Sequence, residues 1–163
     1  MDTLTTQQAF RLAVEQYADT IYRVAVHAAP RREDAEDVVQ DTYERLLRSD
    51  KHFESEEHLK AWLIRVALNR CHDLCRAASG TDLSLDEGMP AAPSGSDGHV
   101  LAAVRALPEP YRDAIYLHYY EGYTAAEIGS MLDKPANTVL SWLARGRSRL
   151  HELLKEDIED EVV

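Results

Sequence analysis

The chain has 163 residues, of which 45% are hydrophobic and two are cysteine, and its formal net charge is −11. This length allows one domain or two small ones, with enough apolar residues for packed cores. Two cysteines are too few for a disulfide-rich secreted fold and suit a reducing compartment. The sequence has neither the start of a signal peptide nor a run of about 18 apolar residues. We therefore expect no membrane insertion and a cytoplasmic location.

The charges are distributed unevenly along the chain. A net charge of −11 taken alone argues against nucleic-acid binding, because phosphates bind basic surfaces. Two segments are nevertheless basic: residues 60–77 hold four bases and one acid, and residues 134–155 hold five bases and one acid. Residues 156–163 hold five acids and no base. Two basic segments in an acidic chain indicate a DNA-binding protein that also has a protein partner.

Helical periodicity predicts three helices in the first half of the chain. The first spans 7–29 and ends before Pro30, the second spans about 33–48 with one charged face, and the third spans about 57–77. A polar connection at 49–57 contains one aromatic residue, Phe53. The residues expected to face inward are Phe10, Val14, Tyr17, Ile21, Val24 and Ala25, then Val38, Val39, Thr42, Tyr43, Leu46 and Leu47, then Leu59, Trp62, Leu63, Val66, Ala67, Cys71 and Leu74.

Residues 80–98 are rich in Gly, Pro, Ser and Asp and predict a linker between two domains. Residues 99–155 predict a second helical unit: a short helix to Leu107, and a helix from Pro108 to Gly122. A capped short helix and a longer basic helix complete it. No segment has a strong strand pattern, so the expected fold class is all-α with two small helical domains joined by a flexible acidic linker.

Residues 124–150 predict a helix-turn-helix. Thr124 and Glu127 have the spacing of a capping box, and Asp133 to Pro135 form the expected turn. In such a motif the second helix enters the DNA major groove and presents its first residues to the base edges. The arginines further along that helix suit phosphates or base edges. The alternative is a helical hairpin with a solvated basic face, since basic residues are favoured near helix C-termini.

The second half then resembles a known family. Residues 106–154 are similar to region 4 of the extracytoplasmic-function (ECF) sigma factors of the sigma-70 superfamily. The matching positions are Leu107, Pro108, Glu109, Glu121, Gly122, Thr124, Glu127, Ile128, Thr138, Val139, Ser141, Leu143, Arg145, Arg147 and Leu150. Independently, residues 34–47 resemble region 2.2, and residues 58–76 resemble the following helix, which melts and reads the −10 element. Two regional matches in the family's order make the resemblance specific.

The resemblance implies a division into region 2 (1–78), a linker (79–98), region 4 (99–155) and an acidic tail (156–163). It implies binding to core RNA polymerase, to promoter DNA and to an anti-sigma protein that restrains the chain, and it implies a monomer when the chain is free. From the residues we expect no cofactor and no metal. The implied polymerase-binding residues are Asp34, Asp37, Gln40, Asp41 and Glu44. The implied −10 residues are Lys60, Trp62, Arg65, Asn69, Arg70, Asp73 and Arg76. The implied −35 residues are Thr124, Asn137, Thr138, Ser141, Arg145, Arg147 and Arg149.

Three positions depart from the family pattern. Leu140 stands where Lys or Arg is common, Trp142 where Arg is frequent, and Gly146 where Ala is usual. A glycine within a helix costs about 1 kcal/mol in helix propensity, and a lost bidentate arginine contact to a base about 1–3 kcal/mol. Leu140 and Trp142 are therefore expected either to abolish or to alter recognition of the −35 element. The alternatives are that they contact thymine methyl groups or sugars, or that they bind a partner protein.

Other features receive ordinary structural interpretations. Cys71, His72 and Cys75 fall short of a tetrahedral metal site, and the tyrosines between 111 and 123 suit helix packing. The acidic tail suits a solvated segment, or alternatively a mimic that covers the basic helix until polymerase binds. No phosphate loop, nucleophile–base pair or paired histidine ligands occur, so we expect no enzyme. The competing hypotheses are a helix-turn-helix regulator without polymerase contact and a sigma-like adaptor acting through a protein partner.

Overall fold

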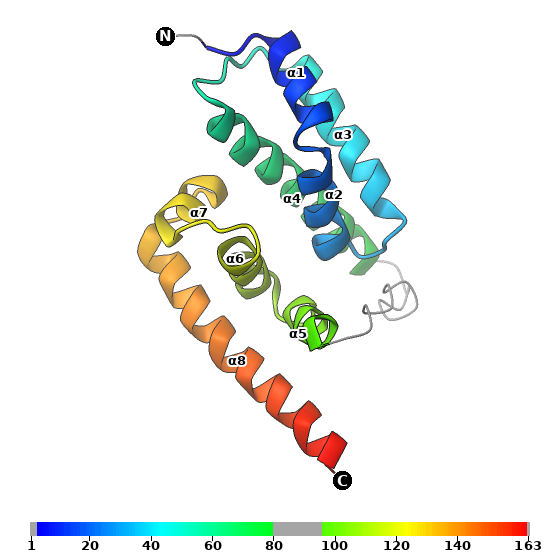
Figure 1. Ribbon diagram of the computed structural model, residues 1–163, viewed down its shortest axis with the longest axis vertical. Coiled ribbons are helices and arrows are strands. Elements are labelled where there is room, and N and C mark those ends of the chain that lie inside the picture. Colours follow the sequence, from blue (N-terminus) through cyan, green and yellow to red (C-terminus); the bar gives the residue numbers. More distant parts are fainter. Residues whose placement is uncertain (1–2, 80–95, 163) are drawn as a thin grey trace. The chain divides into compact units, whose positions relative to one another are not determined.

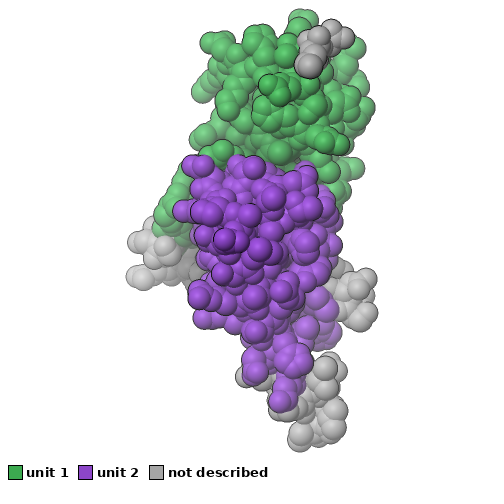
Figure 2. All heavy atoms as spheres, turned by 90° about the vertical axis from the view of Figure 1, so that its left-hand side faces the viewer, with its two compact units in different colours: residues 1–90 green, residues 91–163 purple. Residues whose placement is uncertain are grey.

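The computed structural model describes residues 3–79 and 96–162, which form eight α-helices and one isolated β-bridge (Figure 1). The chain divides into two compact units, residues 1–90 (unit 1) and 91–163 (unit 2), coloured separately in Figure 2. The described residues contain no strand beyond that bridge, so the predicted all-α class is confirmed. None of the described helices is both long and apolar enough to cross a membrane.

Unit 1 begins with two helices, α1 (Thr6–Glu15) and α2 (Ala18–Ala28), so the prediction of one helix over 7–29 was wrong. A capping box between Thr5 and Gln8 starts α1, which is interrupted after Glu15. Both segments are amphipathic, and periodicity alone does not locate such a break. Val14, which was expected to face inward, is 41% exposed.

The core of unit 1 forms where α2 packs against α3 (Asp34–Arg48) and α4 (Glu56–Ser79). Its fully buried large side chains are Ile21, Val24, Val38, Leu46, Phe53, Leu59, Leu63, Ile64 and Leu68. Thr42 is also buried, and its hydroxyl donates to the Val38 carbonyl 2.7 Å away. The predicted stripe on α3 is correct for Val38, Thr42 and Leu46 and wrong for Leu47, which is 53% exposed.

Unit 2 consists of α5 (Ser96–Arg105), α6 (Glu109–Tyr119), α7 (Ala125–Leu132) and α8 (Ala136–Val162). The predicted linker lies mostly outside the described residues, but α5 begins at Ser96, within the span assigned to it. Helices α7 and α8 form the predicted helix-turn-helix, and α8 also packs against α5 and α6. The core residues include Val104, Leu107, Ile115, Leu117, Ile128, Met131, Val139 and Leu143.

Helices α6 and α8 approach closely at Gly146. A Cβ atom at this position would lie 2.8 Å from Cγ1 and 3.2 Å from Cδ1 of Ile115, which is too close without a shift. The glycine is thus explained by helix packing, because its missing side chain lets α8 lie against the buried Ile115. The glycine lowers the helix propensity of α8 as expected, but its missing side chain allows a contact that any larger residue would disturb.

Helix α8 continues to Val162, through most of the span predicted as an acidic tail. A mimic that covers the basic stretch would have to fold back onto its own helix. Residue 156 follows Arg149 by seven residues, which is roughly 10 Å along a continuous helix axis. The continuous helix is therefore incompatible with that mimic hypothesis.

Candidate nucleic-acid and protein interfaces

Helix α3 has one exposed acidic face. Three of the predicted polymerase-binding residues, Asp37, Gln40 and Glu44, are exposed and share this face, since they are spaced three or four residues apart. Leu47 continues the same row, three residues beyond Glu44. The remaining two predicted residues, Asp34 and Asp41, are half-buried at the edge of the face. The acidic face of α3 thus ends in an exposed leucine that the sequence interpretation had placed in the core.

Asp41 and Arg70 form an ion pair between α3 and α4. Nε of Arg70 donates to Oδ2 of Asp41 at 2.6 Å, and each side chain is 35% exposed. The sequence interpretation assigned Asp41 to a protein partner and Arg70 to DNA. The geometry brings the two side chains together, so that each balances the charge of the other and the pair links α3 to α4.

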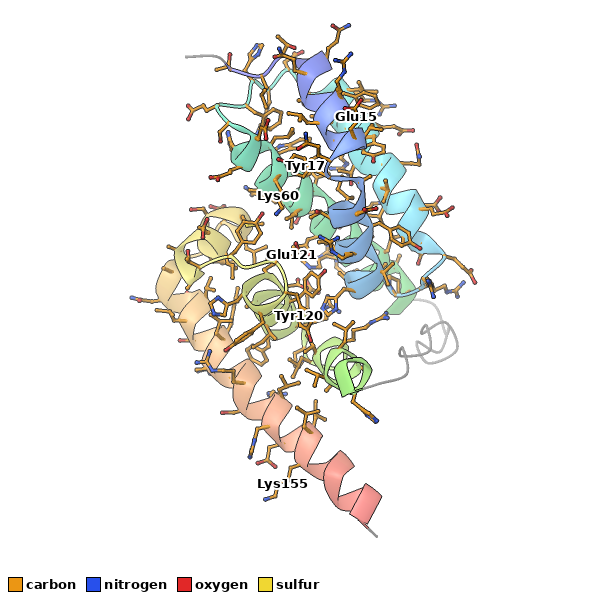
Figure 3. All side chains as sticks on the ribbon, in the orientation of Figure 1. Glu15, Tyr17, Lys60, Tyr120, Glu121 and Lys155 are labelled. Carbon is orange, nitrogen blue, oxygen red and sulfur yellow. The ribbon has the colours of Figure 1, made fainter. Side chains whose placement is uncertain are left out.

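Five of the seven predicted −10 residues lie on one face of α4: Trp62, Arg65, Asn69, Asp73 and Arg76. All of them except the half-buried Trp62 are exposed. Arg76 pairs with Asp73 on the same face. Lys60, labelled in Figure 3, and Arg70 lie on other faces of α4, so the structure does not bring them into this row.

Three kinds of contact hold the loop between α3 and α4 in place: ring packing, a backbone hydrogen bond and a helix cap. Phe53 is 1% exposed, and its ring packs edge-on against His58 and Trp62 at centroid distances of 5.6 and 5.5 Å. The N–H of Leu4 donates to the Phe53 carbonyl at 2.8 Å and forms the isolated β-bridge. Ser55 Oγ accepts from the N–H of His58 at 3.1 Å at the start of α4. The loop's one aromatic ring is thus an anchor and is not free to stack on a base.

The helix-turn-helix of unit 2 is fixed by its caps. Thr124 Oγ1 accepts from the N–H of Glu127 at 3.1 Å, and Oε1 of Glu127 accepts from the N–H of Thr124 at 3.0 Å. These hydrogen bonds lower the pKa of Glu127. Asp133 adopts φ 58°, and a Cβ atom on Gly129 would lie 2.5 Å from the Lys134 carbonyl oxygen. The predicted capping box is confirmed, and the turn depends on a close backbone approach.

The first three turns of α8 expose an uncharged surface, which we call the α8 ridge. It consists of Ala136, Asn137, Leu140, Ser141 and Ala144. Leu140 is 52% exposed, the largest apolar group of the ridge. The predicted −35 residues Asn137 and Ser141 belong to the ridge, whereas Thr138 is half-buried beside it.

Arginines of α8 are held by tyrosines of α6. Nη1 of Arg147 donates to the Tyr119 hydroxyl at 3.2 Å, and the Arg149 guanidinium lies 5.3 Å from the centre of the Tyr111 ring. Arg145 and Arg149 share the other side of α8 and line a shallow depression of about 510 Å³. Ala144, Ser148 and Tyr111 complete its lining. A tyrosine carries no negative charge, so these contacts position Arg147 and Arg149 without an opposing charge.

Two models of known protein families match the chain, one in each unit. The Sigma-70 region 2 family model matches residues 13–81, and the Sigma-70 region 4 model matches residues 99–150. The RNA polymerase sigma factor CarQ of Myxococcus xanthus is 31% identical over 131 residues, which cover 75% of each chain. The ECF RNA polymerase sigma factor SigE of Mycolicibacterium smegmatis is 31% identical over 156 residues, covering 86% of this chain but 60% of that protein.

The chain belongs to the ECF family of sigma-70 factors. Its fold is also that of the sigma factor RpoE of Bartonella quintana, solved in complex with the anti-sigma factor NepR, with a TM-score of 0.73. The two sequences are 24% identical, and the matched region covers 90% of this chain and 96% of the RpoE chain. Sigma factors as a family are not enzymes. The exposed faces of α3, α4 and α8 are therefore candidate binding surfaces.

Several residues of these sigma-factor surfaces were missed from the sequence. Leu47 was assigned to the core although Leu46, one residue earlier, already points inward, and consecutive helical residues differ by about 100°. Tyr111 and Tyr119 were given a packing role, and their contacts with arginines depend on how α6 crosses α8. No sequence signal identifies such partners, because they lie 28 or more residues apart.

Cys71 and Cys75 occupy ordinary positions within unit 1. Cys71 is fully buried and Cys75 Sγ lies 3.5 Å from the carbonyl oxygen of Ala28, as a donor. Both are free cysteines. Their surroundings fit small side chains in a helix core, which is the interpretation that the sequence favoured.

Proposed function

We propose that this chain is an ECF-type sigma factor that binds core RNA polymerase and directs it to promoters. The observation that carries the proposal is the occurrence of two family matches, in order, on two separate units. Each unit also exposes a face with suitable chemistry: an acidic face on α3, and an uncharged ridge next to arginines on α8. The proposal implies that the protein is located in the cytoplasm, that it is a monomer when it is free of polymerase, and that an anti-sigma protein restrains it.

In this mechanism the acidic face of α3 binds the polymerase through Asp37, Gln40 and Glu44. Leu47 adds an apolar contact at the end of that face, where desolvation of a leucine favours association. Asp41 contributes indirectly, because its ion pair with Arg70 holds α3 against α4.

The exposed face of α4 binds the melted −10 strand. Asn69 has both a donor and an acceptor for a base edge, and Arg65 is an exposed cation for the backbone. Trp62 is half-buried and packs against Phe53, so it supports this surface and presents part of its ring. Unit 2 binds the −35 element as duplex, with α8 in the major groove.

A charge reversal on α3 tests the polymerase interface. Glu44→Lys should abolish co-elution with bacterial core RNA polymerase, because it places a cation in the middle of the acidic face. Glu15→Lys is the matched control: Glu15 is an exposed acid at the end of α1 (Figure 3), outside that face, and the change in net charge is identical. If both variants co-elute like the unchanged chain, α3 is not the docking surface.

The competing regulator without polymerase contact gives a different result. It predicts that the unchanged chain fails to co-elute with core polymerase while still binding duplex DNA through α8. A sigma-like adaptor predicts co-elution without promoter-specific transcription.

A further inference from the structure

The α8 ridge is framed by cations but contains none. Lys134 lies in the turn before it, and Arg145 and Arg147 follow one to two turns beyond Ser141 and Leu140. Cations at both ends suit the phosphates on either side of a DNA groove, while the uncharged ridge between them faces the base edges. A protein partner that bound Leu140 through apolar contact would have no need of this charge arrangement.

Leu140 is rigidly placed on this ridge. The preceding residue, Val139, is fully buried, and Leu143 is 3% exposed, so the helix turn that carries Leu140 is anchored in the core of unit 2. Its own side chain is 52% exposed and has no hydrogen-bonding group. Asn137 and Ser141, next to it on the ridge, supply the polar contacts that a base pair needs.

The major groove offers one apolar group among its base edges, the 5-methyl group of thymine. Any other base edge facing Leu140 would lose hydrogen bonds to water without replacement, which is unfavourable. We propose that Leu140 is a specificity-determining residue that contacts the 5-methyl group of a thymine in the −35 element. This inference rests on the proposed reading of −35 duplex by unit 2.

Deoxyuridine substitution tests the contact directly, because deoxyuridine differs from thymidine only by that methyl group. The full chain, bound to bacterial core RNA polymerase, is first used to select −35 sequences from a randomised promoter library. Each thymine of the selected element is then replaced singly by deoxyuridine. We expect one replacement to weaken binding about fourfold, the effect of losing one buried methyl group.

Two variants at the same position complete the experiment. Leu140→Ala should bind the thymine and deoxyuridine promoters equally, whereas Leu140→Met, which keeps an apolar side chain of similar volume, should retain the preference. Both changes are at an exposed site, so unit 2 should fold in each.

Three results would overturn the inference. The first is a selected −35 element in which no thymine methyl matters. The second is a Leu140→Ala protein with the original methyl preference, which would assign the leucine to a protein contact. The third is the absence of any −35 selection, which would overturn the proposed reading of duplex by unit 2 as well and is thereby distinguishable from the first two.

Discussion

In unit 1, arginines of α4 pair with carboxylates: Arg70 with Asp41, and Arg76 with Asp73. In unit 2, arginines of α8 contact tyrosines instead: Arg147 meets the Tyr119 hydroxyl, and Arg149 lies over the Tyr111 ring. Among the described residues, Arg145, Arg147 and Arg149 form no ion pair. Helices α4 and α8 thus position the same residue type with partners of different charge.

This difference explains how an acidic chain can bind DNA. A carboxylate neutralises the arginine it holds, whereas a tyrosine positions the arginine and leaves its positive charge available to a phosphate. The net charge of −11 therefore says little about α8, whose cations keep their charge. The four predictions that follow test the helix packing, the charges and the cap on which the contrast between these helices depends.

The largest effect is expected where α6 and α8 bring tyrosines and arginines together. Gly146→Ala should destabilise unit 2 by about 1–3 kcal/mol, because the new methyl group would overlap Ile115, although alanine is the better helix former. Urea unfolding followed by Trp142 fluorescence in a Trp62→Phe background measures this change. Ile115→Ala removes the two atoms that the methyl group would meet, so the double variant should show strong coupling. A stabilised Gly146→Ala protein would contradict the packing explanation.

The next effect concerns the charge of α8. Arg147→Ala should weaken binding of the holoenzyme to promoter duplex and reduce the slope of log K against log salt by about 0.9, the value for one phosphate contact. Binding titrations at several salt concentrations give the slope. Arg11→Ala removes an exposed arginine of α1 and should leave it unchanged. Equal slopes in all three proteins would show that an arginine held by tyrosine does not meet a phosphate.

A smaller effect is expected for the ion pair of unit 1. Asp41→Asn and Arg70→Gln should each destabilise unit 1, with a coupling of at most about 1 kcal/mol, since both side chains are partly exposed. A double-mutant cycle by urea unfolding, followed through Trp62 in a Trp142→Phe background, measures the coupling. Strictly additive changes would mean that the pair does not join α3 to α4.

The smallest effect concerns the capping box. Because its hydrogen bonds lower the pKa of Glu127 below 4.5, the carboxylate stabilises unit 2 above that pH. That contribution should disappear as the pH falls through the lowered pKa. Glu127→Gln keeps the cap but removes the titrating group. The stability of unit 2 measured by acid unfolding should therefore depend on pH slightly differently in the unchanged chain and in Glu127→Gln. Identical pH profiles would show that the carboxylate does not stabilise unit 2.

Local signals accounted for much of the fold. The capping box at Thr124 and the inward row of Val38, Thr42 and Leu46 follow from spacing alone, and the structure confirms them. The break after Glu15 and the exposure of Leu47 could not be predicted from spacing, because apolar residues at the edge of a helix face fit several periodic patterns. Such ambiguity is resolved only by tertiary packing.

The candidate surfaces were less predictable than the fold. The family resemblance assigned Asp41 to the polymerase and Arg70 to DNA, and it did not indicate that the two side chains form an ion pair. Gly146 departed from the family pattern at an apparent cost, and its reason lies in Ile115, 31 positions earlier in the chain. Contacts of this kind depend on which helices cross, and a single sequence does not contain that information.

The most direct test of the central claim is transcription from a promoter library by bacterial core RNA polymerase, with and without this chain. The sigma-factor account predicts specific start sites that appear only when the chain is present, preceded by shared −10 and −35 elements. Binding to core polymerase without any specific start site would contradict it.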